Sequence, residues 1–224
     1  MSTGNRIKKI LVGLLVFAVI LGLGIHFYKR YSLKSALRPL VLKDNILIEE
    51  MLTITKNSPH ITGPEYFEKA KKNLDDRDDI IYNVKVLSPY FYKKELATYL
   101  ELLNLENEYI RTGLAVSRAL LEAFNKMDWN IREGHEYLAS SYYSSGIYRK
   151  SYLRSLDEAK KANEELEKEH ANYVDIIKKL LSKEKIVWKE LSPLMPNRNL
   201  ISILEEKLKE EEKIEDALKK LENG

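Results

Sequence analysis

Residues 10–28 read ILVGLLVFAVILGLGIHFY, and the rest of the chain is organised around this apolar stretch. It holds no charged residue between Ile10 and Ile25. A helix needs about 20 mostly apolar residues to cross the hydrocarbon of a bilayer, because it rises about 1.5 Å per residue. The stretch is just long enough, and lysines and arginines stand at both of its ends. We therefore expect one transmembrane helix at residues 1–31, followed by a water-soluble domain.

A cleaved signal peptide is the alternative interpretation of this stretch. It would end in small residues around a cleavage site, whereas here the apolar run leads into the sequence HFYKR at 26–30. An uncleaved signal anchor is therefore favoured. A short basic tail before a single span is typical of an anchor whose large domain is translocated, so we expect an extracytoplasmic domain. More positive charge follows the span than precedes it, and this count favours the cytoplasmic alternative.

The basic residues after the span form a candidate site for lipid headgroups. No acidic residue occurs between the span and Asp44. Each lysine or arginine near an anionic membrane surface contributes about 1 kcal/mol of binding free energy. The alternative is that these cations only stop the span from sliding through the bilayer. The candidate residues are Lys29, Arg30, Lys34 and Arg38.

Composition narrows the function of the domain. Apolar residues make up 44% and charged residues 32% of 224 residues, with few glycines and prolines, which suits long helices with charged faces. The first 31 residues hold five basic residues and no acid, so the remainder holds 32 basic and 34 acidic residues. A domain with a net charge of −2 lacks the basic surface that nucleic acid requires, so we expect no nucleic-acid partner. The chain has no cysteine, which excludes disulfides and thiolate chemistry.

The domain reads as helix throughout, because apolar residues recur at alternating spacings of three and four. One stripe over 33–54 contains a single acid, Asp44. A helix over 152–191 keeps heptad spacing, which is typical of a coiled coil or a long bundle helix. Other helices are expected at 64–87, 89–127, 131–144 and 199–222, separated by breaks at 57–64, at Ser88-Pro89, at Asp128-Trp129-Asn130, near Gly146 and at 192–197.

The predicted fold is therefore all-α, with one N-terminal transmembrane helix followed by an elongated antiparallel bundle of coiled-coil-like helices. We divide the chain into the tail and anchor at 1–31, the bundle at 32–197 and a charged amphipathic helix at 198–224. The long stretches at 96–124 and 152–191 are expected to pack antiparallel on each other, with 131–144 as a short helix at one end.

Two polar residues, Asn163 and His170, lie on the apolar seam of the helix over 152–191. In a parallel dimer such residues fix the register of the pairing. Within one bundle they instead form a buried hydrogen bond or line a partly hydrated seam, and we prefer this interpretation. The dimer remains the basis of an alternative function, a ligand-sensing or regulatory bundle.

Motifs for metal-dependent chemistry are incomplete. Residues Asp75–Asp79 contain the DDxxD spacing that helical prenyl-diphosphate enzymes use to hold magnesium, but no second aspartate-rich motif follows. Glu167 and His170 have the Glu-x-x-His spacing of di-iron bundles, but the second copy is missing. A metal-dependent enzyme that uses Asp75–Asp79 is a second alternative. We expect no cofactor, and a binding protein rather than an enzyme.

The segment over 137–152 is the candidate protein-binding surface, because it is rich in tyrosine and serine. Tyrosines at helical spacing are most often part of a core or its rim, but exposed ones give large contact area at low entropic cost. The function we expect is a membrane-anchored scaffold or adaptor at the cell envelope, with a protein partner or a second copy. The candidate contact residues are Tyr137, Tyr142, Tyr143, Tyr148 and Tyr152, with the charged last helix as a second surface.

Overall fold

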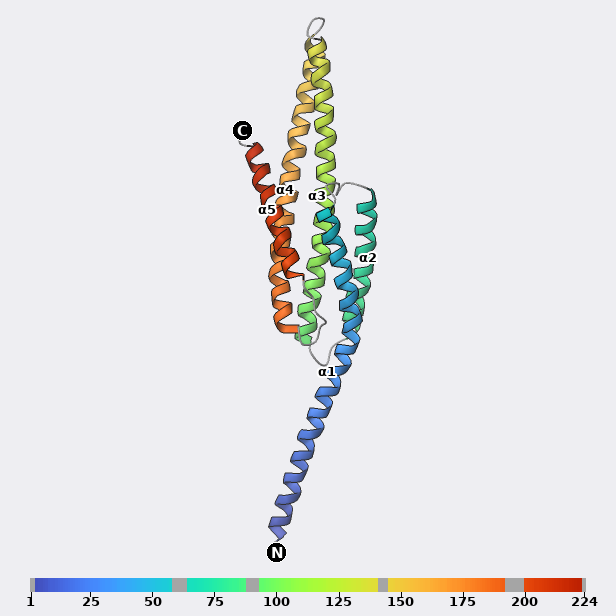
Figure 1. Cartoon of the computed structure of the whole chain (residues 1–224), viewed down its shortest axis with the longest axis vertical. Coiled ribbons are helices and arrows are strands. Elements are labelled where there is room, and N and C mark those ends of the chain that lie inside the picture. The colour runs from blue at the N-terminus through green and yellow to red at the C-terminus, as the bar shows by residue number, and fades with distance from the viewer. Residues whose placement is uncertain (1–2, 58–63, 88–92, 141–144, 192–199, 223–224) are drawn as a thin grey trace.

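The computed structural model has five α-helices over its described residues, which are 3–57, 64–87, 93–140, 145–191 and 200–222. The helices are α1 (Thr3–Asn57), α2 (Pro64–Val86), α3 (Lys93–Ser140), α4 (Ser145–Leu191) and α5 (Ile201–Glu222). Figure 1 shows a tall bundle with α1 protruding from one end and the α3–α4 hairpin from the other. The predicted all-α fold with long bundle helices is confirmed.

Helix α1 joins the apolar stretch to the bundle without a break. Among the described residues it is the one helix with a segment long and apolar enough to cross a membrane. From Leu11 to Tyr28 its large apolar side chains are all exposed, whereas Leu37 and Val41 on the same helix are buried in the core. Pro39 lies inside the helix. The same 55-residue helix therefore supplies both the apolar rod and one wall of the domain.

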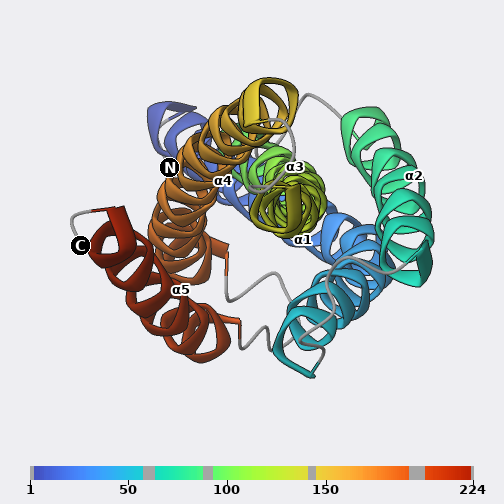
Figure 2. The ribbon, with the colours of Figure 1, turned by 90° about the horizontal axis from the view of Figure 1, so that it is seen from above.

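The bundle consists of two antiparallel hairpins and a fifth helix (Figures 1 and 2). Helices α1 and α2 form the first hairpin, α3 and α4 form the second, and α5 packs on α4 and α1. The antiparallel packing of the two longest bundle helices is confirmed. One continuous core joins all five helices, and its fully buried members include Val41, Ile48, Ala70, Ile80, Tyr99, Leu102, Leu103, Ile110, Ile176, Ile177, Leu180 and Leu204.

The acid that interrupts the α1 stripe belongs to a buried charge network. Arg77 of α2 donates hydrogen bonds to Asp44 at 2.6 Å, to the side-chain oxygen of Asn107 at 2.8 Å, and to Glu106. Asp44 also accepts from the hydroxyl of Tyr99 at 3.1 Å. The side chains of Arg77, Asp44 and Glu106 are wholly buried. This network fixes the heights of α1, α2 and α3 relative to one another.

One predicted break is wrong, and one helix begins earlier than expected. Asp128-Trp129-Asn130 lies inside α3, so 131–140 is not a separate helix but the end of a 48-residue one. The polar side chains of this segment form hydrogen bonds to helical residues. Trp129 donates to Glu133 of the same helix at 3.0 Å, and Asn130 donates to Ser155 of α4 at 3.0 Å. Gly146 lies in the first turn of α4, which begins at Ser145 rather than near 152. The predicted breaks at 57–64, 88–89 and 192–197 fall largely outside the described residues.

A tyrosine cluster closes the top of the five-helix region. Tyr109 and Tyr173 stack with ring centroids 5.2 Å apart, and the Tyr173 hydroxyl donates to the Tyr109 hydroxyl at 2.9 Å. Tyr66 of α2 reaches Gly113, where an added Cβ would lie 3.0 Å from the Tyr66 hydroxyl. Burial raises the pKa of both Tyr66 and Tyr173 above the ordinary value. Above this cluster α3 and α4 continue as a hairpin arm, which we define as residues 118–140 and 145–167.

Candidate binding groove on the hairpin arm

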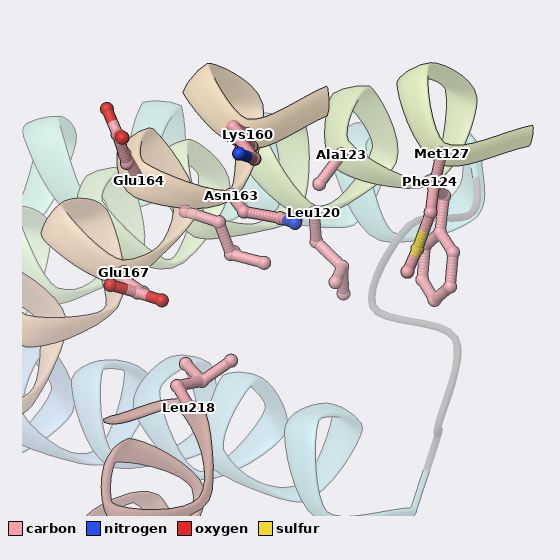
Figure 3. Close-up of a pocket in the computed structure, with 10 residues that line it drawn as sticks. Leu120, Ala123, Phe124, Met127, Lys160, Asn163, Glu164, Glu167 and Leu218 are labelled. Carbon is pink, nitrogen blue, oxygen red and sulfur yellow. The ribbon is translucent and has the colours of Figure 1, made fainter. Parts of the chain in front are cut away.

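A groove with a volume of about 570 Å³ lies between the hairpin arm and the end of α5. Figure 3 shows side chains of α3 and α4 on one side and Leu218 of α5 facing them across the open space. Its surface is mainly apolar, and four polar residues of α4 line part of it. The apolar residues are Leu120, Ala123, Phe124, Met127, Leu166 and Leu218, and the polar residues are Lys160, Asn163, Glu164 and Glu167.

The α3 side of the groove continues a stripe that begins in the core. Positions spaced alternately by four and three along α3 lie on one helical face. From Tyr99 to Ser117 every member of this stripe is buried, but above Leu120 the stripe is exposed. Phe124 is 61% exposed, Met127 51% and Ile131 55%. The stripe consists of Tyr99, Leu103, Glu106, Ile110, Gly113, Ser117, Leu120, Phe124, Met127 and Ile131.

The stripe becomes exposed because its neighbours end. Tyr99 bonds to Asp44, and α1 and α3 run in the same direction, so counting along both helices places Asn57 level with Thr112. Helix α1 therefore ends about two turns below Leu120. On the α2 side, the Arg118 guanidinium lies over the ring of Phe67, 5.9 Å from its centroid. From Leu120 to Ile131 the uncovered stripe is about 16 Å long at 1.5 Å per residue.

Helix α5 shows the same change along its own stripe. Its first three turns place Leu204, Lys207 and Glu211 in buried positions, whereas Ile214 is exposed and Leu218 is half-buried in the groove. Above this level Leu218 of α5 faces the α3 side chains across the groove (Figure 3). Four of the five α4 residues that line the groove are polar and Leu166 is apolar, so the groove is apolar on the α3 and α5 sides and mainly polar on the α4 side.

A buried polar cluster holds α5 in place beside the groove. His170 of α4 lies 2.9 Å from Glu211, and Lys207 lies 2.6 Å from the other oxygen of that carboxylate. Burial alone would raise the pKa of Glu211, but hydrogen bonds from His170 and Lys207 lower it below the ordinary value. His170 therefore makes the intramolecular contact expected of a polar seam residue, whereas Asn163 is exposed in the groove.

Cross-helix contacts keep the two helices of the arm in register. Lys126 pairs with Glu158 at 2.7 Å, and hydrogen bonds from Lys126 and Arg154 lower the pKa of Glu158. Near the end of the arm, Tyr137 and Tyr152 stack with ring centroids 5.8 Å apart and an interplanar angle of 5°. These contacts hold the exposed α3 stripe at a fixed position relative to α4.

The tyrosines of the predicted binding surface differ in their exposure. Tyr137 and Tyr152 are half-buried against each other, and Tyr148 is 39% exposed. Tyr142 and Tyr143 lie outside the described residues. The binding role of these tyrosines stays a prediction.

The residues of the predicted acidic motif do not converge. Asp76 pairs with Lys43 at 2.7 Å, Asp78 accepts from Asn107 at 3.1 Å, and Arg77 between them points into the core. Among the described residues, no group of three or more histidine, aspartate or glutamate side chains has a metal-binding arrangement. The candidate lipid-binding cations lie on α1, where Arg30, Lys34 and Arg38 are exposed and Lys29 is half-buried.

Sequence reasoning missed the groove, although a signal for it was present. The spacing of Leu120, Phe124, Met127 and Ile131 marks them as one apolar face. No protein-family model matches this chain, and no curated protein or solved structure matches it either.

Proposed function

We propose that this chain is a membrane-anchored scaffold that binds an amphipathic helix of a partner protein in the groove of the hairpin arm. The observation that carries the proposal is the α3 stripe, which is buried to Ser117 and exposed from Phe124 to Ile131. Full burial of a phenylalanine, methionine or isoleucine side chain stabilises a complex by about 1.5–3 kcal/mol. An apolar helix face that extends from the core and is exposed to solvent is typical of a surface that binds another protein.

The shape of the groove favours a helix as its occupant. The groove is bounded by α3, α4 and the end of α5, and it lies beyond the end of α1. Lower on the molecule, the amphipathic helix α5 already packs on α4 with its own apolar stripe. An added helix of about three turns would match the 16 Å of uncovered stripe. Glu164 and Glu167 on the polar side favour a partner helix with basic residues beside its apolar face.

Membrane attachment is the second part of the proposal. A cleaved signal peptide would require cleavage within a continuous helix whose next turns form the core, and an uncleaved anchor avoids this. We place the bundle on the extracytoplasmic side, for the reason that a short basic tail precedes one span. Protease treatment of intact cells that carry a C-terminal tag tests the orientation. Loss of the tag supports this side, and its survival until lysis supports the cytoplasmic one.

Selection of helical peptides tests the groove. The full chain in lipid nanodiscs is used to select from a phage library of 15-residue peptides. We expect enrichment of amphipathic helices with basic flanks, whose binding is lost in Phe124→Asp. Leu121→Asp is the matched control, because Leu121 is an exposed residue of α3 that does not line the groove. Circular dichroism checks that both variants stay folded.

Three results would contradict the proposed occupant. Peptides that bind Phe124→Asp as well as the unaltered chain would place the binding site elsewhere. Loss of binding in Leu121→Asp alone would point to the back of α3. Selected peptides without helical periodicity, together with saturable binding of a small apolar dye lost in Phe124→Asp, would favour the alternative of a ligand-sensing bundle.

A further inference from the structure

The end of the bundle where α1 enters lies close to the end of the apolar stretch. Leu33 packs against the core and Leu37 is buried, only five and nine residues after Tyr28. At 1.5 Å per residue these positions are about 8 and 13 Å beyond Tyr28. The headgroup layer of a bilayer is about 5–8 Å thick on each side. Because α1 is unbroken here, the base of the bundle would stand at the headgroup surface.

Contacts between helices show which other residues share this level. Lys43 bonds to Asp76 on the antiparallel α2, so Lys85 is level with Lys34. Asp44 bonds to Tyr99 on the parallel α3, so Lys93 is level with Arg38.

The same count extends to α4. Glu101 of α3 pairs with Lys183 of the antiparallel α4, so Lys189 is level with Glu95, in the first turn of α3. The base therefore gathers cations from four helices, and each of them is exposed. They are Lys34, Arg38, Lys85, Lys93, Lys94 and Lys189.

Charge and apolar residues at the base together match a lipid surface. Only two acids, Glu95 and Glu190, occur among residues 34–38 of α1 and the terminal turns of α2, α3 and α4 that carry the other four cations. The base thus has a net charge of +4 within a domain of net −2. Val86 and Trp188 are 63% and 40% exposed at the same end. Tryptophan favours the membrane–water interface, where its ring is partly immersed and its N–H is solvated.

We propose that this cationic base, formed by the middle of α1 and the ends of α2, α3 and α4, binds the phosphate headgroups of anionic lipids. The inference rests on the proposed membrane attachment and extends it from one helix to the whole lower face of the bundle. Each lysine near an anionic surface is expected to strengthen the contact about fivefold. The contact holds the bundle upright on the leaflet from which it emerges.

Fluorescence of Trp188 measures the contact directly. The chain has two tryptophans, so Trp129→Phe leaves Trp188 as the sole reporter. The full chain is reconstituted into vesicles of phosphatidylcholine alone or mixed with phosphatidylglycerol, each with a nitroxide-headgroup lipid as quencher. We expect quenching at least about fivefold stronger in the anionic vesicles, and a loss of this difference in high salt.

Charge variants test which residues are responsible. The base variant carries Lys85→Gln, Lys93→Gln, Lys94→Gln and Lys189→Gln, and its quenching in anionic vesicles should fall to the level seen in phosphatidylcholine. The matched control removes four cations from the arm, at Arg132, Arg149, Lys150 and Lys161, which are exposed. We expect no change in the control. Circular dichroism confirms that both variants fold.

The outcomes separate this inference from the proposed anchor. A chain that does not co-float with either kind of vesicle overturns the membrane attachment and the base contact with it. A chain that co-floats with both, but shows equal quenching of Trp188 in both, keeps the anchor and overturns the base contact. An equal loss of quenching in the arm control would show that total charge, rather than the base, attracts the lipid.

Discussion

Removal of the Arg77 side chain is the most severe single change that the structure suggests. Arg77 is wholly buried and donates to two carboxylates, Asp44 and Glu106, and to the amide oxygen of Asn107. Arg77→Leu fills much of the same space but leaves both carboxylates buried without their shared cation. Breaking a buried ion pair by removing one partner destabilises a protein by about 3–5 kcal/mol. Asp44 retains the Tyr99 hydrogen bond, so we expect about 4 kcal/mol.

Urea unfolding of the full chain in detergent micelles, followed by circular dichroism at 222 nm, measures this loss. For an m-value of about 2 kcal/mol per molar, the midpoint should fall by about 2 M. The exposed pair Lys43–Asp76 provides the comparison, and Lys43→Gln should change stability by less than about 1 kcal/mol.

A compensated variant tests the physical reason. When Asp44→Leu and Glu106→Leu are added to Arg77→Leu, none of the three charges of this network remains, and such replacements are often neutral or stabilising. We expect most of the lost stability to return. A midpoint shift below about 0.5 M for Arg77→Leu, or a compensated variant no more stable than the single one, would refute the argument from unpaired buried charge.

Three further changes test other parts of the molecule. Gly113→Ala places a methyl group 3.0 Å from the Tyr66 hydroxyl, so thermal unfolding should show a loss of about 1–3 kcal/mol, and a gain would mean that the ring moves freely. The folded-state pKa of Glu211 is below its ordinary value of 4.5, so its contribution is present above that pH and is lost as pH falls through the folded pKa. The urea midpoint of Glu211→Gln should therefore approach that of the unaltered chain in acid, and a constant gap would refute this linkage. Tyr152→Ala removes a stacked ring and should lower the free energy of unfolding by about 1–3 kcal/mol, whereas Tyr148→Ala should change it by less than about 0.5 kcal/mol, both measured by urea unfolding. Equal effects would contradict the assignment of Tyr152 to a half-buried stack and of Tyr148 to the exposed surface.

Helices whose apolar residues recur at regular spacings were predicted from the sequence. The stripe over 33–54 lies on the core, and the acid within it, Asp44, is buried with a counter-charge, as an acid on an apolar stripe must be. The identity of that partner was not predictable. Arg77 stands among four aspartates, in a segment that reads as a solvated charged face. Arg77 faces the core because it lies at helical spacing with the buried residues Ala70, Ile80 and Val84 of α2.

The errors within α3 have a common cause. Asp128-Trp129-Asn130 reads as a turn because its residues favour turns, but tertiary contacts override the propensity. Asn130 bonds across to Ser155, and Lys126 pairs with Glu158 one turn earlier. The groove also depends on contacts between segments that are far apart in the sequence. The spacing of Leu120, Phe124, Met127 and Ile131 marks an apolar face, but its exposure is decided by where α1 and α2 end.

The unbroken α1 has a mechanical consequence, because it provides no joint between the apolar rod and the bundle. From Tyr28 to the level of Lys93, and then along α3 to Ser140, the path is about 85 Å long at 1.5 Å per residue. A rigid lever of that length, tilted by about 10° at its foot, moves its tip sideways by about 15 Å. Apolar helices change tilt when the surrounding bilayer thins or thickens. In the membrane-anchored arrangement that we propose, a change in bilayer thickness would therefore move the far end of the arm by more than the width of a helix.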